Sequence, residues 1–459
     1  MTTLATPRTD LAPARPPGTV LPADPGYDEA RGAWHAKVDQ NPAAVAFPET
    51  AADVVALVRG ARDAGLRVAP QSTGHNAPPL GDLSDTLLIR TGRMRDVVLN
   101  PFDRVVRAGA GAWWGDFVPR ASKMGMSVLH GSSPDVGVAG YSLGGGVGWQ
   151  ARHRGLAANS LTAVELVTAD GEHVRASHHS EPDLFWAIRG GGGNFGVVTA
   201  LEFAMYPMRS VYAGWLVFGW ERSTEVLARW AQWTVEAPEQ VTSVGRILQL
   251  PPIEEIPAPL RGRNLVVVEA AYHGDEASGR ELMAPLRELG PEMDTFAVLP
   301  VEGLARLHQD PEGPTPVLGS HVMLDRFDQD AVDAMVGVAG PDSGSPLMSV
   351  EMRHIGGAAG RPAANAGALS HLDGQYLSFA VSIPMGPESA IAIDAQLRRY
   401  EAALGPFGHG RSYLNFAEQR VDVGTAFAQT ALARLRSIRT QADPDGLFRS
   451  NHEISGAAR

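Results

Sequence analysis

Two dense clusters of glycine place the strongest constraint on how this chain folds. Residues 131–148 (GSSPDVGVAGYSLGGGVG) contain seven glycines in eighteen positions, and residues 190–196 (GGGGNFG) form a second cluster. Glycine tolerates positive φ and lets a backbone approach a ligand closely. Successive backbone N–H groups can then form a concavity that binds anions. Because two such clusters occur in one half of the chain, we predict that they cradle the pyrophosphate of a dinucleotide rather than form plain turns.

The nearest match to a nicotinamide-dinucleotide fingerprint is poor. That fingerprint, G-x-G-x-x-G, lies between a strand and a helix. The candidate GAGAWWG (109–115) has its third glycine displaced by one position, and Trp113 and Trp114 occupy the tight turn. No Gly-Lys-Ser/Thr follows a glycine loop, so a P-loop is absent as well.

Length, charge and cysteine content narrow the class of protein. A chain of 459 residues is expected to form two packed lobes. The formal charge of −12, with arginines scattered among acids, argues against a nucleic-acid partner. The lack of cysteine excludes disulfides, zinc–thiolate sites and Fe–S clusters, and we expect no metal. No apolar run approaches the roughly 20 residues of a membrane span, so we expect no membrane partner. Residues 1–26 lack the apolar stretch of a secretory signal, so we expect them to form a flexible leader and the protein to be cytoplasmic.

Local patterns predict an α/β first part and a different second part. Thr50 and Asp53 form a capping box in front of an apolar helix. Glycine clusters stop at Pro207. Further predicted elements are strands over 66–70, 347–357 and 376–386, a hairpin over 164–176, and helices over 113–125, 386–405 and 424–439. The strand at 66–70 leads into the loop QSTGHNAPPL (71–80), which contains one histidine.

Longer stretches spread over most of the chain carry a family resemblance: 49–76, GVAGYSLGGGVGWQARHRGLAANS and its continuation (137–177), PDLFWAIRGGGGNFGVVTALEF (182–203), EMRHIGGA (351–358), YLNF (413–416) and DPDGLF (443–448). They resemble the FAD-linked oxidases of the vanillyl-alcohol-oxidase fold, in the berberine-bridge-enzyme-like branch. The resemblance implies an α+β fold of two lobes. A PCMH-type FAD-binding domain is expected from residues 27–207 together with 411–459. A substrate domain, residues 208–410, is expected to be an antiparallel sheet covered by helices.

The resemblance gives His75 a specific role. In this family the histidine of the Gly-His motif often carries FAD covalently through the flavin 8α-methyl group. A neutral imidazole nitrogen is a good nucleophile near pH 7, and the small neighbours Ser72, Thr73 and Gly74 leave room for the flavin edge. Taken alone, the loop would suggest only a hydrogen-bonding histidine. A second tether is impossible, because Ser133 occupies the position of the family's flavin-linked cysteine and the chain has no cysteine.

Further contacts with FAD are implied by the same resemblance. The residues lie in the histidine loop, the first glycine cluster, a later strand and the tail: Gln71, Ser72, Thr73, Gly74, His75, Asn76, Ser132, Ser133, Val136, Gly137, Gly140, Gly144, Val198 and Asn415. Gln71 stands where an arginine is common, and Val198 is expected to approach the adenine through its backbone. Val136 and Tyr141 match positions beside flavin C4a and N5. The modest size of Val136 favours access of O2 and therefore an oxidase, and Tyr141 joins the catalytic candidates.

A flavin oxidase needs a base beside the carbon that delivers hydride. Relatives often use the last tyrosine of Tyr-x-Asn-Tyr, but this chain has Phe416 there, which leaves Tyr413 either as the base or as a wall. Glu351 and Arg353 share one face of a strand by period-two alternation. Glu351 is the first candidate base, with Arg353 holding it ionised or binding an anionic substrate; a structural ion pair is the alternative. His371 lacks the arginine that follows it in relatives and is expected to be structural.

The sequence thus predicts an FAD-dependent oxidoreductase, in the first instance an oxidase. A small organic substrate, such as a sugar or a secondary metabolite, would give hydride to flavin N5, and O2 would be reduced to H2O2. Two alternatives stay open. The missing tyrosine is compatible with a flavin-loaded protein that sequesters a ligand without turnover, and a dehydrogenase would use an acceptor other than O2. A monomer or homodimer is expected.

Overall fold

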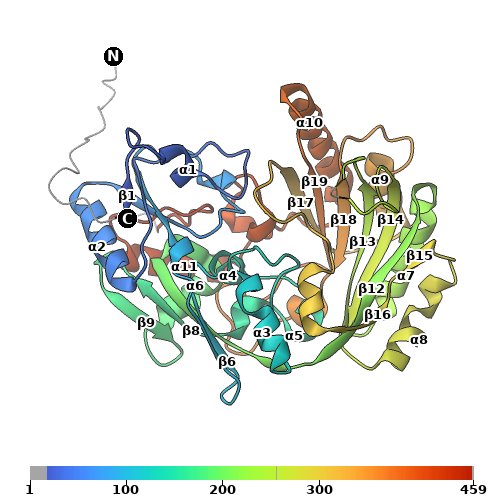
Figure 1. Cartoon of the computed structure of the whole chain (residues 1–459), viewed down its shortest axis with the longest axis horizontal. Coiled ribbons are helices and arrows are strands. Elements are labelled where there is room, and N and C mark those ends of the chain that lie inside the picture. The colour runs from blue at the N-terminus through green and yellow to red at the C-terminus, as the bar shows by residue number, and fades with distance from the viewer. Residues whose placement is uncertain (1–17, 255, 457–459) are drawn as a thin grey trace.

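The computed structural model describes residues 18–254 and 256–456. Figure 1 shows them as two lobes side by side, and the α+β prediction is confirmed. The prediction of a flexible leader over residues 1–26 was wrong for its last part. Residues 1–17 lie outside the described residues, but β1 (Thr19–Val20) pairs antiparallel with β2 (Ala44–Ala46) and so belongs to the first sheet.

A four-stranded sheet begins the first lobe, in the order β1, β2, β4 (Thr86–Arg90) and β3 (Arg67–Gln71). Both β2 and β3 run parallel to β4, and α2 (Ala51–Asp63) connects them. The predicted capping box is confirmed at the start of α2: Asp53 N donates to Thr50 Oγ1, and Thr50 N donates to the Asp53 carboxylate. The chain continues from the end of β3 directly into the histidine loop.

The second sheet of this lobe is antiparallel, in the order β5 (Val97–Asn100), β6 (Val105–Gly109), β10 (Val197–Ala204), β8 (Leu161–Val167) and β9 (His173–Ser177). The predicted hairpin is β8 and β9. The helices are α1 (Tyr27–Arg31), α3 (Val118–Lys123), α4 (Val138–Leu143), α5 (Ala151–Arg154), α6 (Pro182–Gly191) and α11 (Gln429–Ala442). The helix predicted over 113–125 is broken before Val118, because Pro119 is tolerated only in a first turn. The helix predicted from 424 begins five residues later, at Gln429.

The second lobe is built on an eight-stranded antiparallel sheet. Its order is β15 (Met293–Asp294), β12 (Ser210–Gly219), β14 (Asn264–Tyr272), β13 (Val241–Gln249), β18 (Ser349–His354), β19 (Tyr376–Ser382) and β17 (Leu318–Leu324), with β16 (Ala297–Pro300) also paired to β12. A separate two-stranded sheet pairs β7 (Met126–Ser127) with β11 (Tyr206–Pro207).

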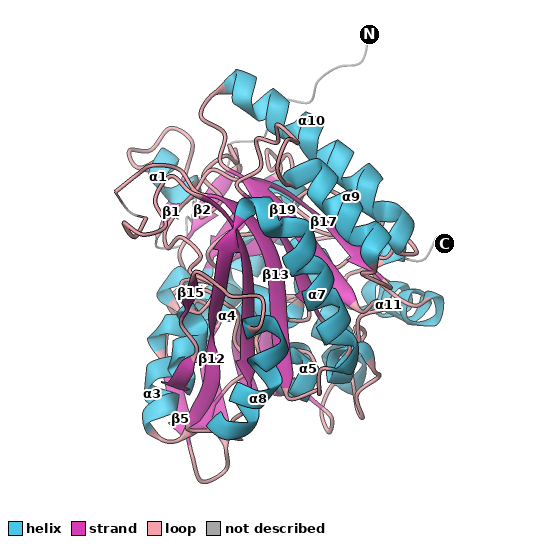
Figure 2. Cartoon of the chain, turned by 90° about the vertical axis from the view of Figure 1, so that its right-hand side faces the viewer, coloured by secondary structure: helices cyan, strands magenta, loops and turns pink. Residues whose placement is uncertain are grey.

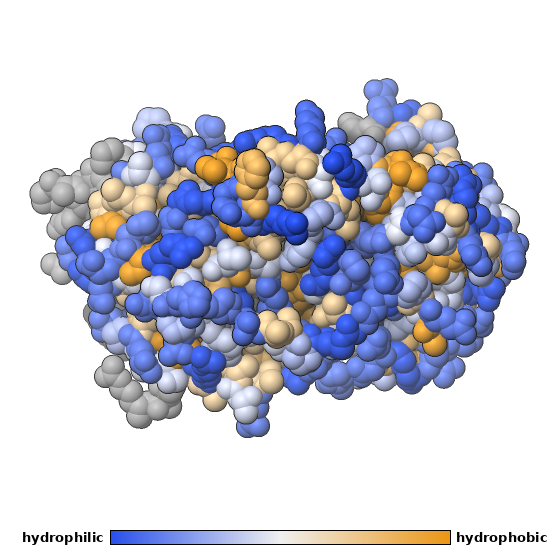
Figure 3. Space-filling model, turned by 90° about the horizontal axis from the view of Figure 1, so that it is seen from below, coloured by the Kyte–Doolittle hydropathy of each residue, from blue (hydrophilic) through white to orange (hydrophobic). Residues whose placement is uncertain are grey.

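Four helices cover one face of the large sheet: α7 (Ser223–Glu236), α8 (Glu276–Arg287), α9 (Gln329–Ala339) and α10 (Pro387–Leu404), as Figure 2 shows. Val350 and Met352 of β18 pack into the hydrophobic core under these helices. Strand alternation therefore turns Glu351 and Arg353 to the opposite face. No helix among the described residues is long and apolar enough to cross a membrane, and the surface seen in Figure 3 is mostly hydrophilic.

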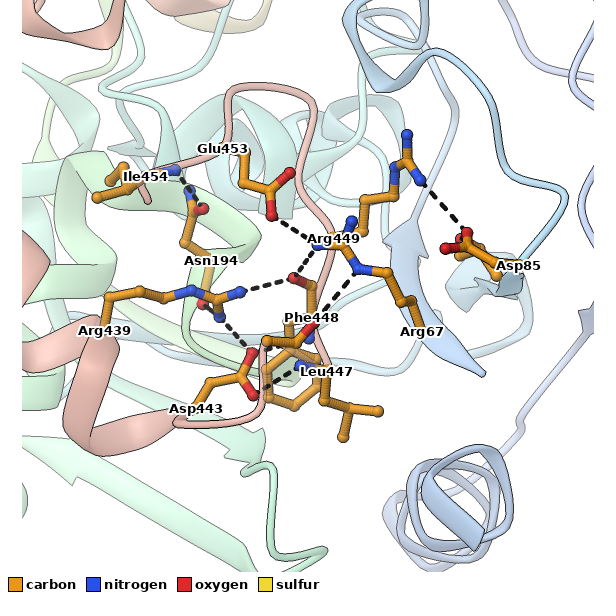
Figure 4. A network of polar contacts seen from close by, with 12 residues as sticks. Arg67, Asp85, Asn194, Arg439, Asp443, Leu447, Phe448, Arg449, Glu453 and Ile454 are labelled. Atoms are coloured by element: carbon orange, nitrogen blue, oxygen red, sulfur yellow. Dashed lines mark hydrogen bonds and ion pairs between the residues drawn. The ribbon is translucent and has the colours of Figure 1, made fainter. Parts of the chain in front are cut away.

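The C-terminal segment returns to the first lobe through a polar network (Figure 4). Arg439 donates to the carbonyls of Asn194 and Phe448, and the Asp443 carboxylate accepts from Phe448 N at 2.8 Å. Arg67 of β3 donates to the same Phe448 carbonyl at 3.2 Å. Because the tail is bonded to the strand that precedes the histidine loop, we propose that residues 27–207, with β1 before them, and residues 411–459 form one domain and residues 208–410 the other.

Candidate functional site

The histidine loop leaves β3 in a tightly held conformation. Gly74 has φ +84°, and a Cβ there would lie 2.8 Å from Ala33 Cβ, so glycine is required. Trp34 N donates to the Thr73 carbonyl at 2.8 Å, and the Trp34 ring stacks on the imidazole of His75 with centroids 3.9 Å apart and an interplanar angle of 16°. Thr73 Oγ1 lies 2.7 Å from His75 Nδ1. The loop therefore fixes both the plane and one edge of the imidazole.

Asp135 faces the other nitrogen of that imidazole, with its Oδ1 3.8 Å from His75 Nε2. Its carboxylate accepts from Ser133 Oγ (2.7 Å), Trp34 Nε1 (2.7 Å) and Gly313 N (2.8 Å). Burial acts to raise the pKa of Asp135, but these donors and His75 outweigh it and hold the pKa below its usual range. Sequence reasoning missed Asp135, although it is the one acidic residue of GSSPDVG.

The His75 imidazole is neutral at physiological pH. Burial lowers its pKa to about 4, and the nearby carboxylate of Asp135 offsets only part of this effect. Although 24% of the side chain is exposed, Nε2 is buried and has no hydrogen-bond partner within the described residues. A neutral imidazole held in a fixed orientation is suited to nucleophilic attack.

The first glycine cluster packs directly on the histidine loop and on the tail. A Cβ on Gly137 would lie 2.7 Å from Ser72 Oγ, and one on Gly144 would lie 1.8 Å from Asn415 Oδ1. Side chains at these two positions are excluded by the chain itself, not only by a ligand. Gly140, in contrast, is exposed, and a Cβ there would meet no described atom within 4 Å, which leaves open space beside it.

The tail residues join the glycine cluster through hydrogen bonds. Tyr413 Oη accepts from Gly146 N at 2.8 Å, and Asn415 Nδ2 donates to the Tyr141 carbonyl at 2.9 Å. Asn76 of the histidine loop donates to three tail carbonyls, at 3.1 to 3.3 Å, so its amide holds the loop to the tail. Burial raises the pKa of both Tyr413 and Tyr141 well above the usual range, which keeps both phenols protonated at neutral pH.

A buried charge network covers the sheet face that looks toward the first lobe. Glu351 Oε1 accepts from Arg353 Nε at 2.6 Å, and Glu351 Oε2 lies 2.7 Å from His308 Nε2. The other nitrogen of His308 is 2.5 Å from Glu269 Oε2, and Glu269 Oε1 pairs with Arg246 Nη2 at 2.7 Å. Sequence reasoning missed His308, Glu269 and Arg246. An isolated glutamate in the apolar strand NLVVVEAAY (264–272) was the available signal for Glu269.

The protonation states within this network follow from its geometry. Burial and Arg246 each act to lower the pKa of His308, but Glu269, Asp310 and Glu351 outweigh them and raise it to about 9. For Glu351, burial acts to raise the pKa, but Arg353 and His308 hold it far below its usual range. Glu351 is therefore a carboxylate with both oxygens engaged, which makes it a weak proton acceptor at neutral pH.

The first glycine cluster and the charge network of the large sheet both border a small cavity, which is lined by Ser132, Trp149, Thr242 and Arg353, among others. The Arg353 guanidinium lies 5.2 Å from the centroid of the Phe416 ring. Ser132 Oγ donates to Asp310 Oδ2 at 2.9 Å. Trp149 Nε1 and Thr242 Oγ1 are buried and have no hydrogen-bond partner within the described residues. The cavity surface is mostly apolar, and the Trp149 N–H and the Thr242 hydroxyl are buried donors just behind it.

The residues present fit an FAD. Among the buried polar atoms without a hydrogen-bond partner in the described chain are Ser72 Oγ, His75 Nε2 and Tyr141 Oη, all from predicted site residues. Gly140, which has open space beside it, directly precedes Tyr141. The partner found for Ser133 Oγ is Asp135. Gln71 Nε2 donates to Gln40 at 3.2 Å, in a buried pair.

Two predicted residues lie apart from these contacts. Val198 is buried in the core of the first lobe, on β10, and Val136 packs against the same core.

His371 lies between Ser370 Oγ (2.8 Å) and Asp373 Oδ1 (3.1 Å), and it lines a pocket together with Arg411. These contacts favour the predicted structural role of His371.

Comparison with known proteins places the chain among flavin-dependent enzymes. Residues 42–177 match the FAD binding domain family. The chain is 28% identical over 448 residues to (R)-6-hydroxynicotine oxidase of Paenarthrobacter nicotinovorans, covering 95% of this chain and 96% of that protein. BBE-like 1 of Physcomitrella patens, solved as a variant, has a TM-score of 0.84 at 21% identity and covers 96% of this chain and 97% of its own. The glucooligosaccharide oxidase of Acremonium strictum, whose FAD is 6-S-cysteinyl and 8α-N1-histidyl, has a TM-score of 0.78 at 21% identity, covering 96% and 97% of the two chains.

Proposed function

We propose that this chain is one of the FAD-linked oxidoreductases that share the PCMH-type FAD-binding fold of the BBE-like oxidases, and that it is an oxidase with FAD attached to His75 alone. The observation that supports the attachment is the imidazole itself: it is neutral, stacked on Trp34, and held between Thr73 Oγ1 beside Nδ1 and Asp135 beside Nε2. The glucooligosaccharide oxidase carries a histidyl FAD, and the absence of cysteine leaves this chain only the histidine bond.

FAD, when bound, supplies a two-electron acceptor for hydride from the substrate. Ser72, Gly140 and Tyr141 would border it on the first lobe, and the sheet face with Arg353 would border the substrate. The buried donors behind the cavity surface, the Trp149 N–H and the Thr242 hydroxyl, would bind acceptor atoms of the substrate.

Glu351 is proposed to position Arg353 rather than to act as the base. Two cations hold Glu351 as a carboxylate of very low pKa, and the protonated His308 and Tyr413 are equally poor acceptors at neutral pH. An alcohol has to lose its O–H proton when it is oxidised, whereas a neutral amine gives up hydride without losing a proton. We therefore propose a small substrate oxidised at a carbon next to nitrogen, in preference to a sugar. The hydroxynicotine oxidase relative is consistent with this choice.

The test has two stages. Acid precipitation of the purified protein should leave yellow flavin in the pellet, on the peptide that contains His75, and His75→Ala should release it. Anaerobic mixing with a panel of cyclic amines and of oligosaccharides should then bleach the flavin only with an amine. Extractable flavin would refute the attachment, and bleaching by sugars alone would refute the amine proposal.

The same experiment separates the two alternatives. Among the described residues, the substrate side lacks a strong proton acceptor, which is also compatible with a protein that sequesters its ligand; in that case the flavin spectrum shifts without bleaching. Reduced flavin that reoxidises slowly in air would indicate a dehydrogenase. The use of O2, the cytoplasmic location and the monomer or homodimer stay predictions from the sequence.

A further inference from the structure

We propose that Asp135 is the positioning residue for the attachment of FAD to His75. Its carboxylate holds the proton of the His75 imidazole on Nε2, which leaves the lone pair of Nδ1 to form the bond with flavin C8α. This inference rests on the proposed histidyl linkage. It concerns a residue of the first glycine cluster that has no role in the cradle itself, because the side chain of Asp135 points at the imidazole.

The carboxylate of Asp135 is aimed by three donors that leave one direction free. Trp34 Nε1 and Gly313 N bind Oδ2, at 2.7 and 2.8 Å, and Ser133 Oγ binds Oδ1 at 2.7 Å. The remaining lone pair of Oδ1 faces His75 Nε2 across 3.8 Å. A movement of less than about 1 Å would give a hydrogen bond of normal length. Trp34 both stacks on the imidazole and binds the carboxylate, so it holds the two groups in register.

A carboxylate beside one imidazole nitrogen selects the tautomer that carries its proton there. The same arrangement orients histidines in hydrolase triads and in metal sites. Here the Nε2–H tautomer directs the lone pair of Nδ1 toward Thr73 Oγ1, 2.7 Å away. The Thr73 hydroxyl donates to that lone pair in the unattached protein and has to turn away when the bond to C8α forms.

The balance of the reaction shows what Asp135 contributes. A C–H bond of the 8α-methyl group breaks, an Nδ1–C8α bond forms, and the imidazole, now a cation, gives up its Nε2 proton. The two electrons released, with the two protons, pass to the flavin ring system, from which O2 takes them as H2O2. Asp135 stabilises the imidazolium as it forms and does not keep its proton, like the aspartate of a hydrolase triad.

Removal of the carboxylate would not act by protonating His75. Burial is the largest influence on the pKa of His75 and lowers it, while Asp135 acts to raise it. In Asp135→Asn the imidazole therefore stays neutral at pH 7. A slower attachment in that variant would report the loss of the carboxylate that selects the tautomer and stabilises the imidazolium, not the loss of a neutral nucleophile.

The experiment follows attachment after FAD is added to full-length protein prepared under riboflavin limitation. The measured quantities are total bound flavin and the fraction that resists acid extraction over time. Asp135→Asn should bind FAD but attach it more slowly by roughly a hundredfold, the effect of losing a carboxylate that selects the tautomer and stabilises the imidazolium. Asp135→Glu should recover part of the rate. The matched control is Asp116→Asn, which removes another carboxylate of the first lobe that accepts a backbone N–H and pairs with an arginine.

Three results would overturn the proposal. In the first, Asp135→Asn attaches FAD at the wild-type rate. In the second, Asp135→Asn loses all FAD while His75→Ala retains it without a covalent bond, which would make Asp135 a binding residue. In the third, Thr73→Val rather than Asp135→Asn abolishes attachment, which would assign the opposite tautomer. Extractable flavin in the wild-type protein is a different result, because it would refute the linkage itself.

Discussion

Replacing His308 with glutamine should destabilise the protein strongly at pH 6 and much less at pH 9.5. The imidazole is clamped between Glu269 and Glu351, 2.5 and 2.7 Å away, and these carboxylates help to raise its pKa from 6.5 to about 9. A rise of this size corresponds to about 3 kcal/mol of unfolding free energy, close to the roughly 3–5 kcal/mol lost when one partner of a buried ion pair is removed.

The sign follows from the direction of the shift. Since the folded-state pKa of His308 is raised, its contribution is complete below the unfolded value of 6.5 and is lost as the pH rises through about 9. The pKa of Glu351 is lowered, so its contribution is present above the unfolded value and does not change in this window. The stability difference between wild type and His308→Gln should therefore shrink by about 3 kcal/mol between pH 6 and pH 9.5.

Urea unfolding, followed by tryptophan fluorescence at about pH 6, 7.5 and 9.5, measures this difference. His409→Gln is the control, because His409 forms an exposed pair with Asp325 at 2.7 Å and exposed pairs contribute only about 0–1 kcal/mol. A difference between wild type and His308→Gln that stays constant across this pH range would refute the buried, protonated state assigned to His308.

Three further changes test other parts of the structure. Glu351→Gln should raise KM more than it lowers the rate of anaerobic flavin reduction. In the wild-type protein this rate should not change between pH 5 and 8 through titration of Glu351, because the pKa of Glu351 lies far below that range. A rate that titrates with Glu351 would restore it as the base. Gly144→Ala should lower the free energy of unfolding, measured in urea, by about 1–3 kcal/mol, since its Cβ would overlap Asn415. Gly60→Ala, with open space inside α2, should instead raise the free energy of unfolding by about 0.5–1 kcal/mol. Equal effects would contradict the close packing at Gly144. Thr50→Ala should cost about 1 kcal/mol through the lost cap, and an unchanged midpoint would show that the cap does not contribute.

Features that depend on near neighbours in the chain were the ones that could be predicted. The capping box at Thr50 needs only residues three apart, and the shared face of Glu351 and Arg353 needs only strand alternation. The break before Val118 was also visible in principle, because a proline follows it directly.

The charge network and the acceptor beside His75 could not be found in this way. His308 meets Glu269 across 39 positions and Glu351 across 43, so no local pattern connects them. Asp135 lay inside a segment already selected for its glycines. Only the folded chain, which brings Trp34 from 101 positions away, shows that its carboxylate faces the imidazole.

One short segment of the second lobe connects the attachment side of the site to the substrate side. His308 belongs to the network around Glu351, Asp310 accepts from Ser132 at 2.9 Å, and Gly313 donates to Asp135 at 2.8 Å. Residues 308–313 thus span from the substrate-facing charges to the carboxylate beside His75. Trp34 and Ser133 hold the same carboxylate from the first lobe. Because Gly313 adds a donor from the second lobe, the group that orients the imidazole is fixed from both lobes at once, and a change in residues 308–313 should alter the attachment side and the substrate side together.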